Sequence, residues 1–325
     1  MPDLNFNNDV EAIEAFVAKY GELRKEIAKV IVGQDEIIKN ILMVMFSRSH
    51  ALLIGVPGLA KTLMITTIAK TINLTYNRIQ FTPDLMPSDI MGTEILDENK
   101  KFKFVKGPVF ANIVLADEIN RTPPKTQSAL LEAMQERSVS MNGVTYQLPD
   151  PFFVLATQNP IEQEGTYPLP EAQQDRFMFN ISLDYPTFDD EVNVVKSTIH
   201  GKMVEPNPIL TMEEILFYQN LLQKIPISDN VYEYAVKLAT MTRPNTELAH
   251  PWANDYLAWG AGPRASQFLI IGARTHAVIN GKYSPDIEDV RAVAPNILRH
   301  RIIKNYKAEA EGISINDIIQ KLMYA

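Results

Sequence analysis

The chain has 325 residues, of which 46% are hydrophobic and 22% are charged, and these proportions are typical of a globular protein with one large domain or two moderate ones. Its 31 Lys and Arg residues are outnumbered by 39 Asp and Glu residues, and the net charge of −8 argues against nucleic-acid binding as the main function, because nucleic-acid-binding proteins usually carry a basic face. The chain contains no cysteine, which excludes disulfides and thiolate metal sites and favours the reducing cytoplasm as its location.

The N-terminal residues and the apolar segments indicate neither export nor membrane insertion. Residues 1–5 lack the basic and apolar regions of a signal peptide. No apolar segment approaches the roughly 18 to 20 residues that cross a bilayer. We therefore expect a cytoplasmic protein without a membrane span.

Short apolar segments alternate with helical patterns in the first half of the chain. Five strands are expected, at residues 51–54, 77–81, 112–116, 152–157 and 177–183. Helices are expected at residues 35–47 and 122–137, the second with Thr122 as N-cap and Pro123 in the first helical position. Short apolar strands separated by helices predict an α/β fold with a parallel five-stranded sheet that is covered on both faces.

Two hairpins are expected between these elements. The first lies between residues 92 and 109 and turns near Glu98-Asn99, and the second spans residues 138–148 and turns at Asn142-Gly143. The segment around residues 80–110 is longer than a simple connection between a helix and a strand. It is either a plain edge hairpin or an insert with its own function.

The pattern changes after about residue 190, where strand-like segments end and helical periodicity dominates. Residues 230–241 and 267–278 have this periodicity, and Ser284-Pro285-Asp286 opens another helix with acidic residues in its first turn. We therefore expect an α/β domain at residues 1–188 and a smaller all-helical domain at residues 189–325.

A candidate phosphate-binding loop follows the first expected strand. Its residues are Gly55, Val56, Pro57, Gly58, Leu59, Ala60, Lys61 and Thr62, and a helix follows them. The pattern resembles G-x-x-x-x-G-K-[ST], in which backbone N–H groups surround phosphate oxygens. Lys61 is then expected to reach the β- and γ-phosphates of ATP, and the Thr62 hydroxyl to bind Mg²⁺.

One position departs from this pattern, because Ala60 stands where the last glycine is usual. Alanine adds only a methyl group, so the turn is expected to survive with a negative φ at Ala60.

Asp117 and Glu118 end the third expected strand. An acidic pair at a strand end is often only a solvated pair or a helix start, but here it accompanies a phosphate loop. Asp117 is therefore expected to support Mg²⁺, and Glu118 to act as the general base that polarises the attacking water.

Asn159 follows the fourth expected strand, and ligands bind at such strand ends in open parallel sheets. It could orient the attacking water, or it could be a turn residue before Pro160. The five histidines are dispersed and do not have the spacing of metal ligands.

With these residues in place, the sequence resembles the MoxR family of AAA+ ATPases over nearly its whole length. The motifs that carry the resemblance are Ile31-Val32-Gly33-Gln34, the loop Gly55 to Thr62, Leu115 to Arg121, Ala156 to Pro160, Glu164 to Ala172, Asp175-Arg176-Phe177, Gly262 to Ala265 and Leu298 to Arg301. Alanine at the position of Ala60 is common in this family.

The resemblance implies further site residues. It implies that Val32 and Gly33 bind the adenine, and that Leu63 belongs to the nucleotide site beside the loop. Asn159 would be the sensor-1 residue. Arg176 would be an arginine finger that completes the site of a neighbouring subunit, although Arg176 could instead pair with Asp175.

Arg264 would be the sensor-2 arginine at the γ-phosphate, although it could instead cap a helix or form a surface ion pair. Arg299 and Arg301 lie at a basic helix end, where cations already suit the helix dipole, and we do not assign them to the site. The segment at residues 80–110 would be the helix-2 insert, which faces the ring pore or a partner.

The resemblance also implies a function. It predicts an ATPase that forms an oligomer, a hexameric ring in the manner of AAA+ proteins, and that remodels or assembles other protein complexes in a chaperone-like way. Its partners would include proteins with von Willebrand factor A domains. The alternatives are a helicase-like nucleic-acid motor, a magnesium-chelatase-like motor subunit, and a scaffold that binds nucleotide without hydrolysing it.

Overall fold

The computed structural model describes residues 6, 8–56, 58–96, 98, 100–161, 165–200 and 204–325. The chain forms two compact units. The α/β unit contains the described residues of 21–176 and 181–216, and the helical unit contains those up to residue 20 together with 177–180 and 217–325. Each unit combines segments that are distant in sequence. The expected boundary between two domains at residue 188 therefore stays a prediction.

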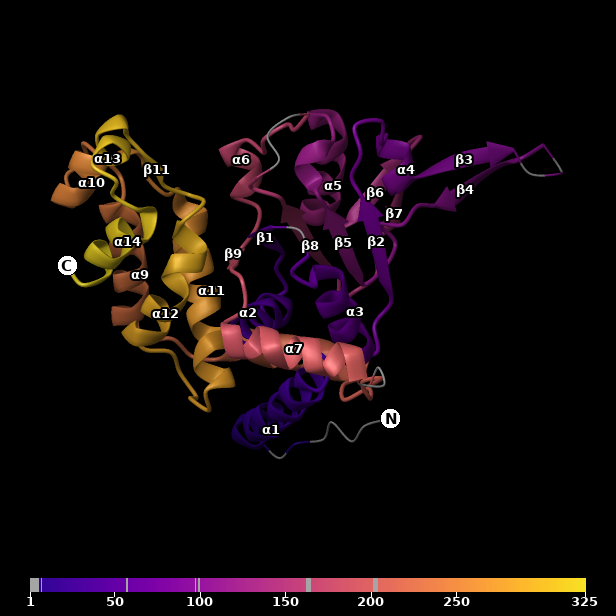
Figure 1. Ribbon diagram of the computed structural model, residues 1–325, viewed down its shortest axis with the longest axis horizontal. Helices are drawn as coiled ribbons and strands as arrows, with labels where there is room; N and C mark the ends of the chain where they lie inside the picture. The colour runs from indigo at the N-terminus through magenta and orange to yellow at the C-terminus, as the bar shows by residue number, and fades with distance from the viewer. Residues whose placement is uncertain are drawn as a thin grey trace. The chain divides into compact units, whose positions relative to one another are not determined.

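A five-stranded sheet forms the centre of the α/β unit, with the strand order β2-β5-β8-β1-β9 (Figure 1). The strands are β1 (Ala51–Gly55), β2 (Tyr76–Gln80), β5 (Ile113–Asp117), β8 (Phe153–Gln158) and β9 (Phe179–Leu183). Strands β2, β5, β8 and β1 pair in parallel, and the three inner strands are buried over almost their whole length. Apolar strands buried on both faces are typical of a parallel sheet, so the expected α/β fold is confirmed.

Helices connect the strands. They are α1 (Asp9–Ala28), α2 (Asp35–Phe46), α3 (Lys61–Thr71), α4 (Pro87–Met91), α5 (Pro124–Glu136), α6 (Glu171–Gln174) and α7 (Phe188–His200). Helix α2 confirms the expected helix at residues 35–47. Helix α1 is long and places Phe16 and Leu23 in fully buried positions, but the sequence analysis does not predict it.

The start of α5 differs from the prediction. Pro123 is the N-cap and Pro124 the first helical residue, so the assignment of Thr122 as the N-cap is wrong. Residues Ile119–Arg121 form a short 3-10 helix, η1, and Thr122 ends it. The Thr122 hydroxyl donates a hydrogen bond to the carbonyl of Thr82 at 2.9 Å. It therefore binds a loop carbonyl and does not cap the N–H groups of the helix.

Both expected hairpins are present. Strands β3 (Gly92–Leu96) and β4 (Phe102–Lys106) form the first, which extends away from the sheet in Figure 1. Its turn includes Asn99, which lies outside the described residues. Strands β6 (Ser138–Met141) and β7 (Val144–Gln147) form the second. Asn142 and Gly143 have φ angles of 49° and 81°, as a two-residue hairpin turn requires.

The C-terminal part of the chain is helical, as predicted. Its helices are α8 (Met212–Lys224), α9 (Asp229–Met241), α10 (Pro251–Tyr256), α11 (Pro263–Ile279), α12 (Ile287–Leu298), α13 (Tyr306–Ala310) and α14 (Ile315–Met323). A short antiparallel pair, β10 (Leu257–Trp259) with β11 (Ile303–Lys304), is an addition to the expected all-helical arrangement. Strands of three and two residues are too short to give a pattern in the sequence. Within the described ranges, no helix is long and apolar enough to cross a membrane.

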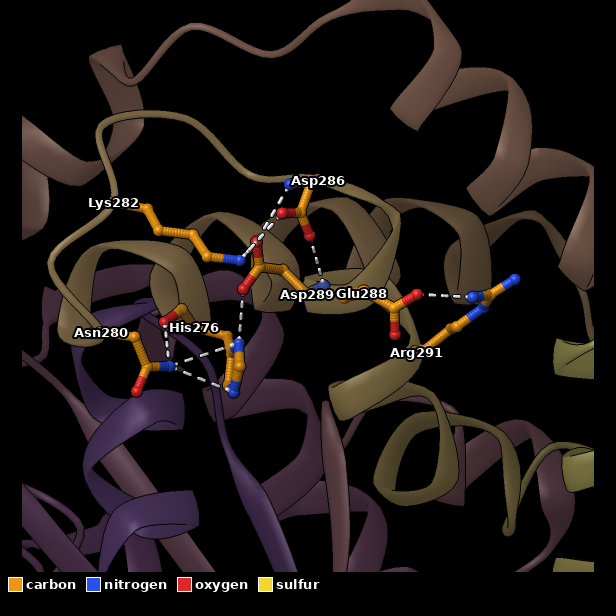
Figure 2. A network of polar contacts seen from close by, with 7 residues as sticks. All are labelled: His276, Asn280, Lys282, Asp286, Glu288, Asp289 and Arg291. Atoms are coloured by element: carbon orange, nitrogen blue, oxygen red, sulfur yellow. Dashed lines mark hydrogen bonds and ion pairs between the residues drawn. The ribbon is translucent and has the colours of Figure 1, made fainter.

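A polar network joins the end of α11 to the start of α12 (Figure 2). Asp289 is almost fully buried, and it receives bonds from His276 at 2.7 Å and from Lys282 at 3.0 Å. Asp286 is the N-cap of α12 and forms a capping box with Asp289. The expected helix start at Asp286 is therefore confirmed, and the network fixes the turn between the two helices.

Candidate nucleotide site

The phosphate loop connects β1 to α3, as the sequence predicts. Gly58 has φ +88°, and no atom of the described residues outside its chain neighbours lies within 4 Å of a Cβ added there, so this part of the loop faces open space. Pro57 lies outside the described residues. Ala60 is the residue before α3 and has φ +53°, so the expectation of a negative φ is wrong. The loop must reverse direction between Gly58 and Lys61, and the left-handed conformation at Ala60 makes that reversal.

Lys61 is the first residue of α3 and its side chain turns back over the loop. Its ammonium donates a hydrogen bond to the carbonyl of Gly55 at 2.5 Å. Burial lowers the pKa of Lys61, while the charges of Asp117 and Glu118 oppose that shift. The electrostatic coupling places Lys61 in one cluster with the two carboxylates. Thr62 is half-buried beside it, and Leu63 is 37% exposed.

Asp117 lies at the end of β5 and is held on both oxygens. Oδ1 accepts the Thr157 hydroxyl at 2.6 Å, and Oδ2 accepts two N–H groups of Arg78 at 2.6 and 3.1 Å. The side chain of Asp117 is only 14% exposed. These bonds fix the orientation of the carboxylate at the end of the strand.

Glu118 follows with φ +57°, a conformation that is uncommon for a residue other than glycine. Its Oε2 accepts the Gln80 amide at 2.8 Å and the Arg121 guanidinium at 3.1 Å. Its backbone N–H donates to the Thr157 hydroxyl at 2.9 Å. Strained backbone that is held by several bonds is frequent at functional sites.

Asn159 lies just beyond β8, which is the neighbour of β5 in the sheet, and it is only 5% exposed. Its Oδ1 accepts the N–H of Ile161 at 3.2 Å. Its buried Nδ2 has no hydrogen-bond partner among the described residues. Buried donors are nearly always satisfied, so this N–H group is available for a ligand.

The segment Val32-Gly33-Gln34 precedes α2. Gly33 has φ +75°, and a side chain there would lie 2.6 Å from Asp190 of α7. The Gln34 amide donates to the carbonyl of Leu59 in the phosphate loop at 3.5 Å. The segment therefore lies beside both the phosphate loop and the first turn of α7, where only glycine fits at position 33.

The two arginines lie in different settings. Arg176 is half-buried, and its side chain makes no hydrogen bond or ion pair with the described residues; it lines a concavity of about 440 Å³ with Glu132 and Glu136 of α5. Arg264 is in the first turn of α11 in the helical unit and is half-buried. Glu164, from one of the family motifs, lies outside the described residues.

The structure thus brings together Lys61, Asp117, Glu118 and Asn159, while Arg264 belongs to the other compact unit. It adds four residues that the sequence analysis misses, namely Arg78, Gln80, Arg121 and Thr157. Arg78 also donates to the Gln80 amide oxygen at 2.6 Å, so strand β2 holds both carboxylates through linked bonds. The sequence holds a signal for two of them: Arg78 and Gln80 are two positions apart in an expected strand, so their side chains share one face of it.

The residues of the site fit ATP and Mg²⁺. Thr62 and Asp117 supply hydroxyl and carboxylate oxygens, which are the ligands that Mg²⁺ prefers. Lys61 supplies a cation beside the loop, and Asn159 supplies a buried donor without a protein partner among the described residues. Within the same ranges, no cluster of His, Asp or Glu forms a separate metal site.

The fold and the site define a class of protein, a P-loop ATPase of the AAA type with a helical lid region. The profile of the "ATPase family associated with various cellular activities (AAA)" matches residues 50–179, and the profile of the "AAA lid domain" matches residues 251–322.

Individual relatives narrow this class. The chain is 43% identical to the chaperone MoxR1 of Mycobacterium tuberculosis over 302 residues, which cover 92% of this chain and 79% of the relative. It is 30% identical to protein MoxR of Methylorubrum extorquens over 301 residues, which cover 86% and 85% of the two chains. A crystal structure from Cytophaga hutchinsonii, of a protein proposed to be an ATPase, has a TM-score of 0.89 and 45% identity and covers 96% of this chain and 95% of its own. The chain belongs to the MoxR family of AAA ATPases.

Proposed function

We propose that this protein hydrolyses ATP in a Mg²⁺-dependent reaction and uses the energy to remodel or assemble other proteins. The observation that carries the proposal is the cluster of Lys61, Asp117, Glu118 and Asn159 at the carboxyl ends of three adjacent strands. Ligands bind at this edge in open parallel sheets. Membership of an ATPase family supports ATP as the nucleotide.

The phosphate loop would hold the nucleotide. Gly55, Gly58, Leu59 and Ala60 would present backbone groups to the phosphates, and Lys61 would exchange its bond to the Gly55 carbonyl for phosphate oxygens. Pro57 would belong to the same loop but has no N–H to donate. Val32, Gly33 and Leu63 would line the nucleotide site. Thr62 and Asp117 would hold Mg²⁺, which neutralises phosphate charge when bound.

Glu118 would accept a proton from the attacking water, and the Nδ2 of Asn159 would orient the γ-phosphate or that water. Gln80 and Arg121 both donate to the Oε2 oxygen of Glu118. The Oε1 oxygen would therefore be the one that accepts the proton, while the two bonds orient the carboxylate, so both partners are expected to affect the rate.

We propose that Arg176 acts on the site of a neighbouring subunit in an oligomer, which by analogy would be a hexameric ring. The side chain of the half-exposed Arg176 makes no hydrogen bond or ion pair with the described residues of its own chain, which leaves the guanidinium free for a second chain. A guanidinium finger offsets charge on the phosphates in the transition state and contributes roughly 10³ to 10⁵ in rate in related enzymes. Arg264 would contact the γ-phosphate from the lid region.

The client is proposed from family relationship. A relative is named a chaperone, which supports protein clients, with von Willebrand factor A domain proteins as candidates. The β3–β4 hairpin carries exposed apolar side chains, including Leu96 and Phe102, and is a candidate contact for the client. We also propose a cytoplasmic location, on the absence of cysteine.

The test is steady-state ATP hydrolysis as a function of protein concentration, with particle size measured in parallel. Wild-type specific activity is expected to rise with concentration as a large ATP-bound species forms. Glu118→Gln should bind ATP without turnover, and Lys61→Ala should not bind it.

Activity that is independent of concentration in a monomer would contradict the shared site. Wild-type ATP affinity in Lys61→Ala would contradict the assignment of the phosphate loop.

A further inference from the structure

The segment immediately after Arg176 is built into the helical unit. Phe177 and Met178 are fully buried and belong to the same compact unit as residues 217–325. Their carbonyl groups are bound by two side chains at the end of α12, His300 and Arg301, which lie more than 120 residues away in sequence. The two peptide groups that follow Arg176 in the chain are therefore held in place by side-chain hydrogen bonds.

Arg301 makes most of these bonds. Its guanidinium donates to the Phe177 carbonyl at 2.6 Å and to the Met178 carbonyl at 3.2 Å, and also to the carbonyl of Ile297 in the last turn of α12. It lies over the ring of Phe268 at 4.9 Å. The planar fork of arginine holds several donors in fixed directions, whereas the ammonium of lysine is a compact charge on a flexible stem.

His300 binds the same segment. Its Nε2 lies 3.0 Å from the Phe177 carbonyl, while its Nδ1 has no hydrogen-bond partner among the described residues. A carbonyl only accepts, so the Nε2 carries the proton and donates it. Burial and the charge of Arg301 keep the pKa of His300 well below its ordinary value, so the ring is a neutral donor near pH 7.

These two side chains are costly to bury if stability is their only role. His300 is 8% exposed and Arg301 is 6% exposed. A buried cation costs free energy that its bonds only partly return, and apolar residues of similar size often stabilise a core as well or better. A role in fixing the main chain beside Arg176 explains why donors occupy these positions.

We propose that His300 and Arg301 are positioning residues for Arg176, which they orient through the Phe177 and Met178 peptides. The proposal rests on the proposed function, in which Arg176 completes the site of a neighbouring subunit. A misplacement of about 1 Å in a group that contacts the reacting atoms can cost roughly 100-fold in rate. Through these bonds the helical unit of one subunit controls hydrolysis in the next subunit.

The first test is Arg301→Met, which keeps the apolar stem and removes the donors. ATP hydrolysis is expected to fall at least tenfold in kcat, with the KM for ATP within about twofold of wild type, because the nucleotide site of the same chain is intact. Arg301→Lys keeps a charged donor group but loses the planar fork, so its kcat should lie between those of Arg301→Met and wild type.

The matched control is Arg291→Met. Arg291 is in α12, which ends three residues before Arg301, and it also binds a main-chain carbonyl, that of Met323 at 3.1 Å, but this carbonyl is near the C-terminus rather than beside Arg176. Arg291→Met should lower the unfolding temperature to a similar extent and leave kcat within about twofold of wild type. A fall in kcat equal to that of Arg301→Met would show a general effect of a weakened lid and overturn the proposal.

The decisive test mixes inactive variants. Glu118→Gln cannot hydrolyse ATP but can donate its Arg176, whereas Arg301→Met has an intact site and cannot donate. A mixture in equal amounts should therefore recover roughly a quarter of wild-type activity if the ring assembles at random from head-to-tail contacts. Recovery also shows that Arg301→Met is folded. If Arg301→Met does not fold on its own, Arg301→Lys replaces it in the mixture.

The mixture of Arg176→Ala with Glu118→Gln separates the two proposals. If this mixture recovers activity and the Arg301 mixture does not, the positioning role is wrong while the shared site stands. If the Arg176→Ala mixture does not recover, or if Arg176→Ala alone retains wild-type activity, the shared site itself is wrong.

Discussion

At the residue scale, two residues of the site have a backbone conformation that normally suits glycine. Ala60 and Glu118 both have positive φ, at 53° and 57°. A left-handed conformation costs about 1 to 2 kcal/mol for a residue with a Cβ atom. Both strained residues lie at the candidate site: Ala60 directly before α3 and Glu118 directly after β5.

Replacement of Ala60 by glycine should relieve the strain in the phosphate loop. We expect Ala60→Gly to bind ATP at least as tightly as wild type and to be stabilised by up to about 1 kcal/mol, with the added freedom of the unfolded chain offsetting part of the gain. Urea unfolding and ATP titration measure the two quantities. A variant that is destabilised by more than 1 kcal/mol would show that the methyl group makes contacts that outweigh its strain.

Thr157 should position both carboxylates of the site. Its hydroxyl is fully buried and joins Asp117 to the N–H of Glu118. Thr157→Val removes these bonds at nearly constant volume, and a loss of about 1.5 to 3 kcal/mol corresponds to a fall of roughly 10- to 100-fold in kcat. Thr157→Ser keeps the hydroxyl and is the control. Equal activity in the valine and serine variants would refute the role.

At the element scale, His50 connects three elements of the α/β unit. It precedes β1, accepts the N–H of Val154 in β8 on Nδ1 at 3.0 Å, and approaches the Met134 carbonyl of α5 with Nε2 at 3.3 Å. The ring must be neutral to make both bonds, because one nitrogen accepts. Burial, followed by the charge of Arg137, lowers the pKa of His50 to about 4.

The pKa of His50 predicts a loss of stability in mild acid. The folded pKa of about 4 lies below the ordinary value of 6.5, so the unfolded chain binds the proton more readily. Stability from this group is complete above pH 6.5 and falls by about 3 kcal/mol as the pH drops to 4. Urea unfolding at pH 7 and pH 4.5 should show a smaller difference for His50→Gln than for wild type. The same difference in both proteins would contradict the prediction.

Asp289 should stabilise the helical unit through the network of Figure 2. Burial alone raises the pKa of Asp289, but bonds from His276, from the backbone of Asp286 and from Lys282 outweigh it and lower the pKa to about 2. This stabilisation is present above the ordinary value of 3.8 and is lost as the pH falls towards 2. Asp289→Asn should cost about 2 kcal/mol at pH 7, measured by urea unfolding, and less at pH 3.

The sequence predicts the charged residues of the site better than it predicts the residues that hydrogen-bond to them. Lys61, Asp117 and Glu118 stand in local motifs at strand ends, so their chemistry could be assigned before their positions were known. Arg78 and Gln80 act across strands, because Gln80 pairs in register with Asp117. That register depends on the strand order, which no local pattern encodes. His300 and Arg301 bind main-chain carbonyls, which have no signature in the sequence.

At the scale of the whole molecule, ATP binding should stabilise the folded chain. A ligand at about 100 times its Kd adds about 2.7 kcal/mol when only the folded state binds it. Scanning fluorimetry of Glu118→Gln, which retains ATP, should show an unfolding temperature that rises with ATP concentration. Lys61→Ala should show no rise. An equal rise in Lys61→Ala would mean that ATP binds elsewhere on the chain.

Helix α1 has a consequence for how the protein can be divided. Its residues up to Tyr20 belong to the helical unit, where Phe16 packs against Tyr218 with ring centroids 5.0 Å apart, and its remaining residues belong to the α/β unit. A protein fragment that contains only the C-terminal half would lack Phe16, and the space beside Tyr218 in the core of the helical unit would be left empty. Anyone who dissects this protein, or fuses a reporter to it, must therefore keep the first helix with the last ones.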